Sequence, residues 1–240
     1  MGRARAHQRV DRRITMKLKH LFIIAVLAAI PLTAWAWGVV SISGAPAGIA
    51  YKSSAKWEVD ENPHSSISFA AQSVSTGDLI VVGFNTTKDS ALYTCADNVN
   101  TGNYTQAFTY NAVGQGSVTV WYKIADASGN ATVTVTTDSG NADYCRGVLG
   151  IYTGVAATPL DVYNYGRGTF TDATDTVATA SSTTTADGNL IIGCAAATGG
   201  ATNTYTAGTG FTLRQQARTG SYPLMLEDRI QTTAGATTAT

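Results

Sequence analysis

The segment Leu79-Ile80-Val81-Val82-Gly83-Phe84 is a continuous apolar run that follows the turn residues Thr76-Gly77-Asp78. Two later segments repeat this arrangement, Val148 to Tyr152 and Leu190 to Ala195, the second of them after Asp187-Gly188. Short apolar runs of this kind, bounded by turn residues, are typical of central strands that are covered on both faces. They predict a fold in which β-sheets are stacked on one another.

Two further segments, Ser117 to Lys123 and Ala131 to Thr137, alternate apolar and polar residues with a period of two. The turn-rich sequence Asp126 to Asn130 lies between them. This pattern predicts an antiparallel hairpin with one buried face. No segment after Ala36 has a sustained 3.6-residue pattern, so we expect almost no helix.

The regular spacing of short strands and turns predicts an all-β fold, an antiparallel β-sandwich of jelly-roll type. We expect a single sandwich domain over residues 65–240 and an N-terminal extension over residues 37–64. Residues 1–36 are interpreted as a leader with a signal peptide.

The leader contains the ten-residue apolar run Leu21 to Ile30, with Lys17 and Lys19 before it and Ala34-Trp35-Ala36 after it. This order is typical of a secretory signal, with cleavage expected after Ala36. The run is shorter than the roughly 20 residues that a membrane-spanning helix needs, although an uncleaved anchor remains the alternative. We therefore expect a secreted or cell-surface protein, extracellular and without a membrane span in its mature chain.

Removal of the leader changes the charge of the protein. The full chain carries 16 basic and 16 acidic residues, but seven of the basic residues and one acid, Asp11, precede the cleavage site. The mature chain then has nine basic and fifteen acidic side chains, a net charge of −6. Without a basic surface, nucleic acid is not an expected partner.

The three cysteines, Cys95, Cys145 and Cys194, all lie in the exported part, where disulfides persist. Cys194 lies within an apolar run and is expected to be a buried thiol. Cys95 and Cys145 flank turn-rich segments, and we predict that they form a disulfide, with three reduced cysteines as the alternative. No Cys-x-x-Cys or Cys/His spacing indicates a zinc site.

Catalytic groups are sparse. His64 is the one histidine of the mature chain, and no Gly-x-Ser-x-Gly motif accompanies it. Glu227 and Asp228, beside Arg229, are interpreted as part of a surface or rim ion pair. We therefore predict a protein that is not an enzyme and needs no cofactor.

Two turns are rich in oxygen ligands, one with Asp97, Asn98 and Asn100 and the other with Asp138, Asn141 and Asp143. Neither has the spacing of a known calcium loop. Asn and Asp are also common in turns because they bond to nearby backbone groups, so we predict no metal site.

Exposed aromatic rings provide the best indication of a ligand, because sugar rings present apolar C–H faces to them. Tyr163 and Tyr165, near Arg167, are the principal candidates and are expected in a loop; Tyr104 and Tyr110 are others. Trp121, Tyr122 and Tyr152 lie in predicted strands and are expected in the core or on a sheet face. Three glycosylation sequons lie at or near turns, at Asn85, Asn103 and Asn130.

Several motifs occur in an order that resembles a widespread bacterial family of secreted, adhesin-like β-sandwich modules of unassigned function. They are Gly77 to Val82, Asp97-Asn98, Asn103 to Thr105, Val120 to Tyr122, Ile151 to Gly154, Pro159 to Asp161, Ala207 to Arg214 and Leu226 to Ile230. The similarity covers about Ser65 to Thr240. It implies an extracellular, adhesive or carbohydrate-associated role and transfers no catalytic residue.

Members of that family usually continue into a final apolar strand, whereas this chain stops at Thr240. An incomplete sequence is one interpretation. The other is that the groove is filled by Trp37 to Ser43, a short apolar strand whose assembly residues would be Trp37, Val39, Val40 and Ile42. Strand addition within one chain completes a monomer, whereas addition to a neighbour forms a filament by self-association. The sequence thus favours an exported structural or adhesive protein, or a filament subunit, with a carbohydrate-binding module as the alternative.

Overall fold

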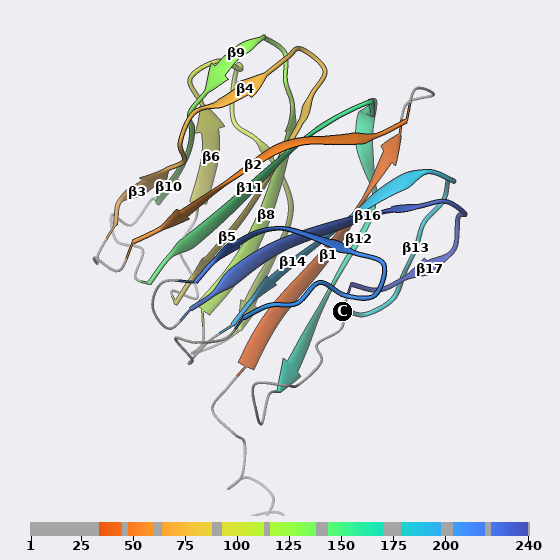
Figure 1. Cartoon of the computed structure of the whole chain (residues 1–240). Helices are drawn as coiled ribbons and strands as arrows, with labels where there is room; N and C mark the ends of the chain where they lie inside the picture. Colours follow the sequence, from red (N-terminus) through yellow and green to blue (C-terminus); the bar gives the residue numbers. More distant parts are fainter. Residues whose placement is uncertain are drawn as a thin grey trace, which may run out of the picture. The chain divides into compact units, whose positions relative to one another are not determined.

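The computed structural model describes residues 34–44, 48–59, 64–87, 93–112, 116–137, 144–169, 179–197, 204–218 and 222–239. Throughout these ranges the regular elements are strands, and every paired strand is antiparallel (Figure 1). The predicted all-β, antiparallel fold is therefore confirmed. A search of the same residues finds no helix with the length and hydropathy needed to cross a membrane.

Three sheets form the body of the fold. The β1 sheet has the order β12 (Val155–Thr169), β1 (Ala34–Gly44), β14 (Asn189–Ala196), β16 (Leu224–Gln231) and β15 (Thr212–Ala217). The β5 sheet has the order β2 (Ala50–Glu58), β11 (Arg146–Thr153), β5 (Leu79–Thr86), β8 (Gly116–Ile124) and β7 (Thr105–Ala112). The β10 sheet consists of β3 (Ser66–Ser68), β10 (Val133–Thr137) and β6 (Tyr93–Asp97).

Two short pairs complete the described strands. β4 (Gln72–Val74) pairs with β9 (Gly129–Ala131), and β13 (Ser182–Thr183) pairs with β17 (Ala236–Thr237). Both of the large sheets receive a strand from the segment predicted as an N-terminal extension, because β1 and β2 come from it.

Two hydrophobic cores separate the sheets. The first lies between the β1 and β5 sheets and contains Leu79 and Val81, while the second lies between the β5 and β10 sheets and contains Ile80 and Val82. The β5 sheet is therefore covered on both faces, and every residue of β5 is buried. This arrangement confirms the interpretation of the apolar runs as central strands, and it adds a third layer to the two of a simple sandwich (Figure 1).

The predicted hairpin is wrong. β8 belongs to the β5 sheet and β10 to the β10 sheet, so residues 125–132, which include β9, carry the chain from one layer to another. Ala125 anchors this crossing, because its N–H donates to the Asp78 carbonyl and its carbonyl accepts from Gly77 N–H. β8 also has apolar residues on both faces, with Val120 in the first core and Trp121 in the second.

β1 occupies the interior of its sheet, between β12 and β14. Val39, Val40 and Ile42 are almost completely buried, with Val40 and Ile42 in the first core. The apolar N-terminal strand therefore fills a position in the sheet of its own chain.

Candidate functional site: an aromatic surface between β7 and β12

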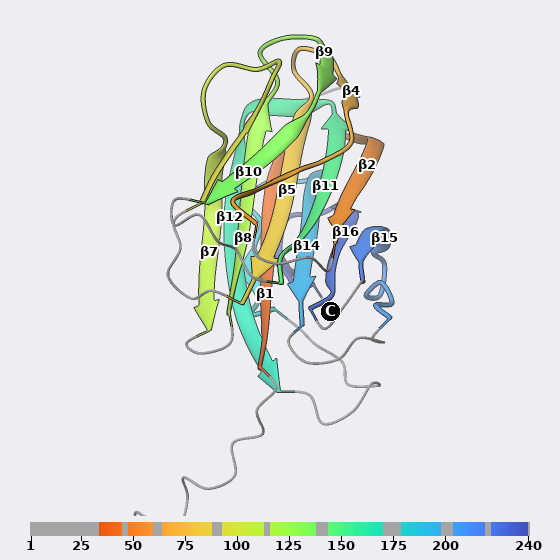
Figure 2. The same ribbon diagram turned by 90° about the vertical axis from the view of Figure 1, so that its left-hand side faces the viewer.

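β12 is an edge strand of the β1 sheet, and β7 is an edge strand of the β5 sheet. The two strands are neighbours at the same side of the stack (Figure 2). Tyr163 and Tyr165 are two residues apart on β12 and therefore project from the same face of the sheet. Their partners on β1 are Val40 and Gly38. Because Val40 lies in the first core, this face of β12 is the one that looks toward the β5 sheet.

Both tyrosines rest on aromatic rings of β7. The ring centroids of Phe108 and Tyr163 are 6.3 Å apart with an interplanar angle of 11°, and those of Phe108 and Tyr165 are also 6.3 Å apart, at 27°. The ring centroids of Tyr110 and Tyr165 are 5.3 Å apart. We call these four residues the aromatic surface.

The surface combines exposed rings with a rigid support. Tyr163 is 50% exposed and Tyr165 is 44% exposed, whereas Phe108 is only 4% exposed. The rings of Tyr163 and Tyr165 are thus held in place from below while much of each remains accessible. A ring fixed in this way loses little conformational entropy when a ligand stacks on it.

Gly38 makes room for the supporting ring. A Cβ atom added at Gly38 would lie 1.5 Å from Cζ of Phe108, so the phenyl ring covers the place where a side chain of β1 would be. Sequence reasoning found Tyr110, Tyr163 and Tyr165 but missed Phe108 and Gly38. The period-two spacing of Phe108 and Tyr110 was the signal for a shared face, but it did not show which strand would face them.

The structure corrects the local context of the predicted ligand residues. Tyr163 and Tyr165 lie in strand β12 and not in a loop. Arg167 belongs to the same strand, opposite Ala36, but its side chain is outside the described part of the chain. Tyr104 is buried and donates a hydrogen bond to Oδ2 of Asp97 at 2.7 Å, so it offers no open ring face.

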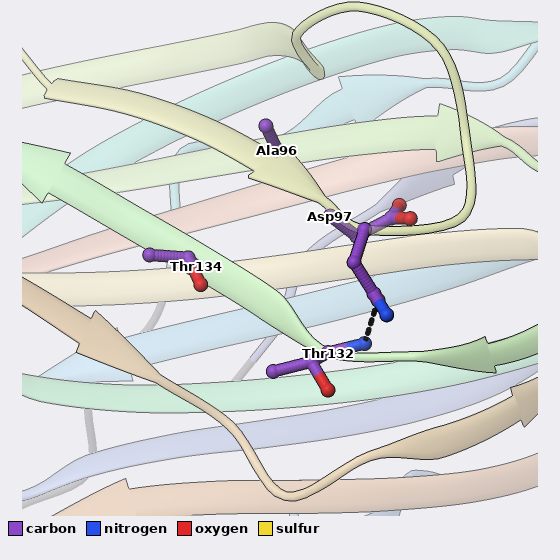
Figure 3. A pocket seen from close by; sticks show the side chains of 5 residues that line it. Ala96, Asp97, Thr132 and Thr134 are labelled. Atoms are coloured by element: carbon purple, nitrogen blue, oxygen red, sulfur yellow. Dashed lines mark hydrogen bonds between the residues drawn. The ribbon is translucent and has the colours of Figure 1, made fainter.

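A shallow, open depression of about 350 Å³ lies on the β10 sheet, lined by Ala96, Asp97, Asn98, Thr132 and Thr134 (Figure 3). Asn98 accepts a hydrogen bond there from the Thr132 N–H at 2.7 Å. The residues around the depression therefore bond to one another.

The Asp97 carboxylate is occupied by the protein itself. Oδ1 accepts from the N–H groups of Val99 and Asn100, and Oδ2 accepts from the Asn100 amide and from Tyr104. Burial raises the pKa of Asp97, but these hydrogen bonds outweigh burial and leave the pKa below its usual value. The geometry is that of a turn, as the sequence predicted.

Within the described ranges, no group of three or more His, Cys, Asp and Glu residues is placed to hold a metal. The second oxygen-rich turn, with Asp138, Asn141 and Asp143, lies outside those ranges.

The interpretation of Glu227 and Asp228 as surface residues is wrong. Both are buried, because β16 lies between β14 and β15, and residues 204–211 and the C-terminal segment cover the outer face, on which Glu227 lies. Asp228 forms an ion pair with Arg214 at 2.7 Å. His64 is half-buried and packs edge-to-face on Trp57, with 4.8 Å between the ring centroids.

The cysteines are buried in both cores. Cys95 and Cys145 lie in the second core and Cys194 in the first, and no disulfide joins Cys95 to Cys145 in the structure, in contrast to the predicted pairing. Burial raises the pKa of the Cys95 thiol, with Asp97 adding to the effect, and it raises that of Cys194 to about 12. Thiols this strongly desolvated react slowly, because the thiolate is the reactive form.

The three sequons differ in accessibility. Asn103 and Asn130 are exposed, the latter in β9. Asn85 is 3% exposed within β5 and donates its amide to the Tyr222 carbonyl at 3.3 Å. The folded protein cannot accommodate a glycan on Asn85.

Trp121 and Tyr152 are buried, as predicted, and Tyr122 is half-buried beside the first core. Comparison of the chain with protein-family models, with curated proteins and with solved structures found no match.

Proposed function

We propose that this chain is an exported, non-enzymatic, adhesive β-sandwich protein that binds glycans through the aromatic surface. The observation that supports it best is the pair of half-exposed rings, Tyr163 and Tyr165, stacked on the buried ring of Phe108. Sugars bind to such rings through their apolar C–H faces, and adjacent polar groups fix their orientation.

The polar groups on the aromatic surface itself are the hydroxyls of Tyr110, Tyr163 and Tyr165. Asn111 on β7 and Asn164 on β12 alternate with these residues and face the other side of their strands. Asn164 already donates to the Ser181 carbonyl, which holds the neighbouring segment against β12. Because the four aromatic residues carry no charge, a neutral polysaccharide is the ligand class that fits them.

Binding to a glycan array, followed by titration calorimetry with the strongest ligand, tests the proposal. Tyr163→Ala and Tyr165→Ala should each weaken affinity about tenfold, since removal of a stacked ring costs on the order of 1–1.5 kcal/mol. Tyr144→Ala is the matched control, because Tyr144 is also 47% exposed but its ring contacts Tyr222, outside the aromatic surface. Glycan binding that survives removal of both β12 tyrosines would exclude the aromatic surface as the site.

A second candidate function is that of a filament subunit joined by strand addition. The supporting observation is that β1, which begins at Ala34 and spans the predicted cleavage site, completes the sheet between β12 and β14. In the structure β1 serves its own chain. A neighbour's β1 could make the same backbone hydrogen bonds and bury the same side chains.

Electron microscopy of the mature protein beginning at Trp37 tests this second function. Filaments that are lost when Trp37 to Ser43 are deleted, and that the intact protein fails to form when a free peptide of that sequence is added as a competitor, support strand addition. A monodisperse monomer at high concentration argues against it.

A further inference from the structure

Two segments cover the outer face of the β1 sheet, the face turned away from the β5 sheet. Tyr205, from the segment 204–211, packs with Leu213 on Ala195 and Met225. Phe211, at the end of the same segment, packs near Val39, Ile191 and Ala239, the last of these from the C-terminal segment. We call residues 204–211 the cover.

Glu227 lies beneath the cover with 0% exposure. Its Oε2 atom accepts a hydrogen bond from the N–H of Gly208, at 2.8 Å, which ties the cover to β16. Its Oε1 atom is buried and has no hydrogen-bond partner among the described residues. Space for the side chain comes from Gly193 of β14, where an added Cβ would lie 2.8 Å from both Cγ and Oε1 of Glu227.

Few charges face this carboxyl. Arg229 lies two residues further along the same face of β16, with its guanidinium 4.7 Å from the Phe211 ring and its Nη2 donating to Thr237. Asp228 points to the other face, where it pairs with Arg214 of β15. Among the described residues, those placed next to Glu227 by the other elements are uncharged at neutral pH: Gly193 of β14, Leu213 of β15, Gly208 of the cover and Ala239 of the C-terminal segment.

We propose that Glu227 is a pH-dependent latch that keeps the cover closed while its carboxyl is protonated and lets it open when the carboxyl ionises. An ionised carboxylate with one unbonded oxygen is costly in an apolar site. Local opening of the cover allows water to reach that oxygen and removes the cost.

Burial raises the pKa of Glu227 from 4.5 to about 7, although the Gly208 hydrogen bond and Arg229 act in the opposite direction. The ionisation therefore falls near neutral pH. Because the pKa of the closed state lies above that of the open state, the stability of the closed cover is greatest below pH 4.5. It decreases as the pH rises through about 7.

Opening would uncover apolar residues of the β1 sheet, chiefly Val39, Ile191, Ala195 and Met225, which are buried in the closed form. A pH change would thus alter which surface an exported protein presents to its surroundings.

Amide hydrogen exchange at pH 5 and pH 8, corrected for the intrinsic pH dependence of exchange, tests the latch. In the wild-type protein the opening equilibrium of residues 204–211 should rise between about tenfold and 70-fold, the upper figure being the change between these two pH values for a pKa of 4.5 in the open state and about 7 in the closed state. In Glu227→Gln it should be the same at both pH values. Asp187→Asn is the control, because Asp187 bonds to the Ala234 N–H in a neighbouring turn and its loss should leave the pH effect intact.

The amides of β5 serve as an internal reference for global unfolding. If they change as much as those of the cover, the effect is global and there is no latch. The proposal is also overturned if the opening equilibrium of the cover in the wild type does not change with pH. It is overturned likewise if the opening equilibrium in Glu227→Gln still changes with pH. Should Glu227→Gln fail to fold, the comparison of cover and β5 in the wild type still decides between local opening and global unfolding.

Discussion

Gly38 and Phe108 connect the N-terminal strand to the aromatic surface, and their coupling can be measured. In Gly38→Ala the new methyl group would lie 1.5 Å from Cζ of Phe108, so the ring must move. Overpacking of this kind costs about 1–3 kcal/mol. Phe108→Ala removes a ring that is 4% exposed, at a cost of about 3–5 kcal/mol.

If the two sites were independent, the double variant would lose about 4–8 kcal/mol, the sum of the two ranges. We expect a loss no larger than that of Phe108→Ala alone, because the alanine methyl at position 38 then occupies space that the ring has left. The coupling free energy should therefore be about 1–3 kcal/mol in the favourable direction. Displacement of Phe108 should also weaken glycan binding in the single Gly38→Ala variant, since Tyr163 and Tyr165 rest on that ring.

Equilibrium urea denaturation of the protein, followed by tryptophan fluorescence, provides the four free energies of unfolding. The control cycle combines Phe108→Ala with Gly147→Ala, because Gly147 contacts Phe69 and Ile67 in the second core and should act independently of Phe108. An additive Gly38/Phe108 cycle, or a Gly38→Ala variant as stable as the wild type, would refute the packing of β1 beneath β7.

Three other measurements follow from the buried polar groups and thiols. Asp97→Asn should reduce the free energy of unfolding by about 1–2 kcal/mol at pH 7. The difference should shrink as the pH falls through the lowered pKa of Asp97, because both proteins then carry a neutral group; equal differences at pH 7 and pH 2.5 in urea titrations would contradict this. A thiol reagent should label the native protein slowly and find three thiols after denaturation, whereas one thiol would establish the disulfide predicted from sequence. Expressed in a host that glycosylates sequons, the protein should carry glycans at Asn103 and Asn130 and none at Asn85, as peptide mass mapping can determine.

The central strands could be predicted because burial on both faces removes polar residues from them. β5 and β14, which the apolar runs indicated, are buried along their whole length. Their partners could not be predicted, since a period-two pattern reports which residues share a face but not which sheet they join. β8 and β10 show this limit, because only residues 125–132, which include the short strand β9, separate them and yet they belong to different layers.

The candidate site was only partly predictable for a related reason. Aromatic residues two positions apart indicated Tyr163 and Tyr165, but Phe108 supports them from another sheet, and that contact depends on tertiary packing. Glu227 was misassigned because a charged triplet at the end of an apolar run is common where a strand reaches solvent. Here the cover and the C-terminal segment bury Glu227 on one face of β16, and Asp228 is buried on the other face, where it pairs with Arg214.

The two proposed functions share one structural requirement, the presence of β1 between β12 and β14. Gly38 accommodates Phe108, and the register of β1 with β12 places Tyr163 opposite Val40 and Tyr165 opposite Gly38. The aromatic surface therefore depends on this strand, although none of its exposed rings belongs to it. In a monomer the strand comes from the same chain, so each molecule carries a complete surface. If neighbours supplied it, each surface would be supported by two chains, and glycan binding would be lost and regained together with assembly. Glycan affinity that does not change with the assembly state would then separate the adhesive role from strand exchange.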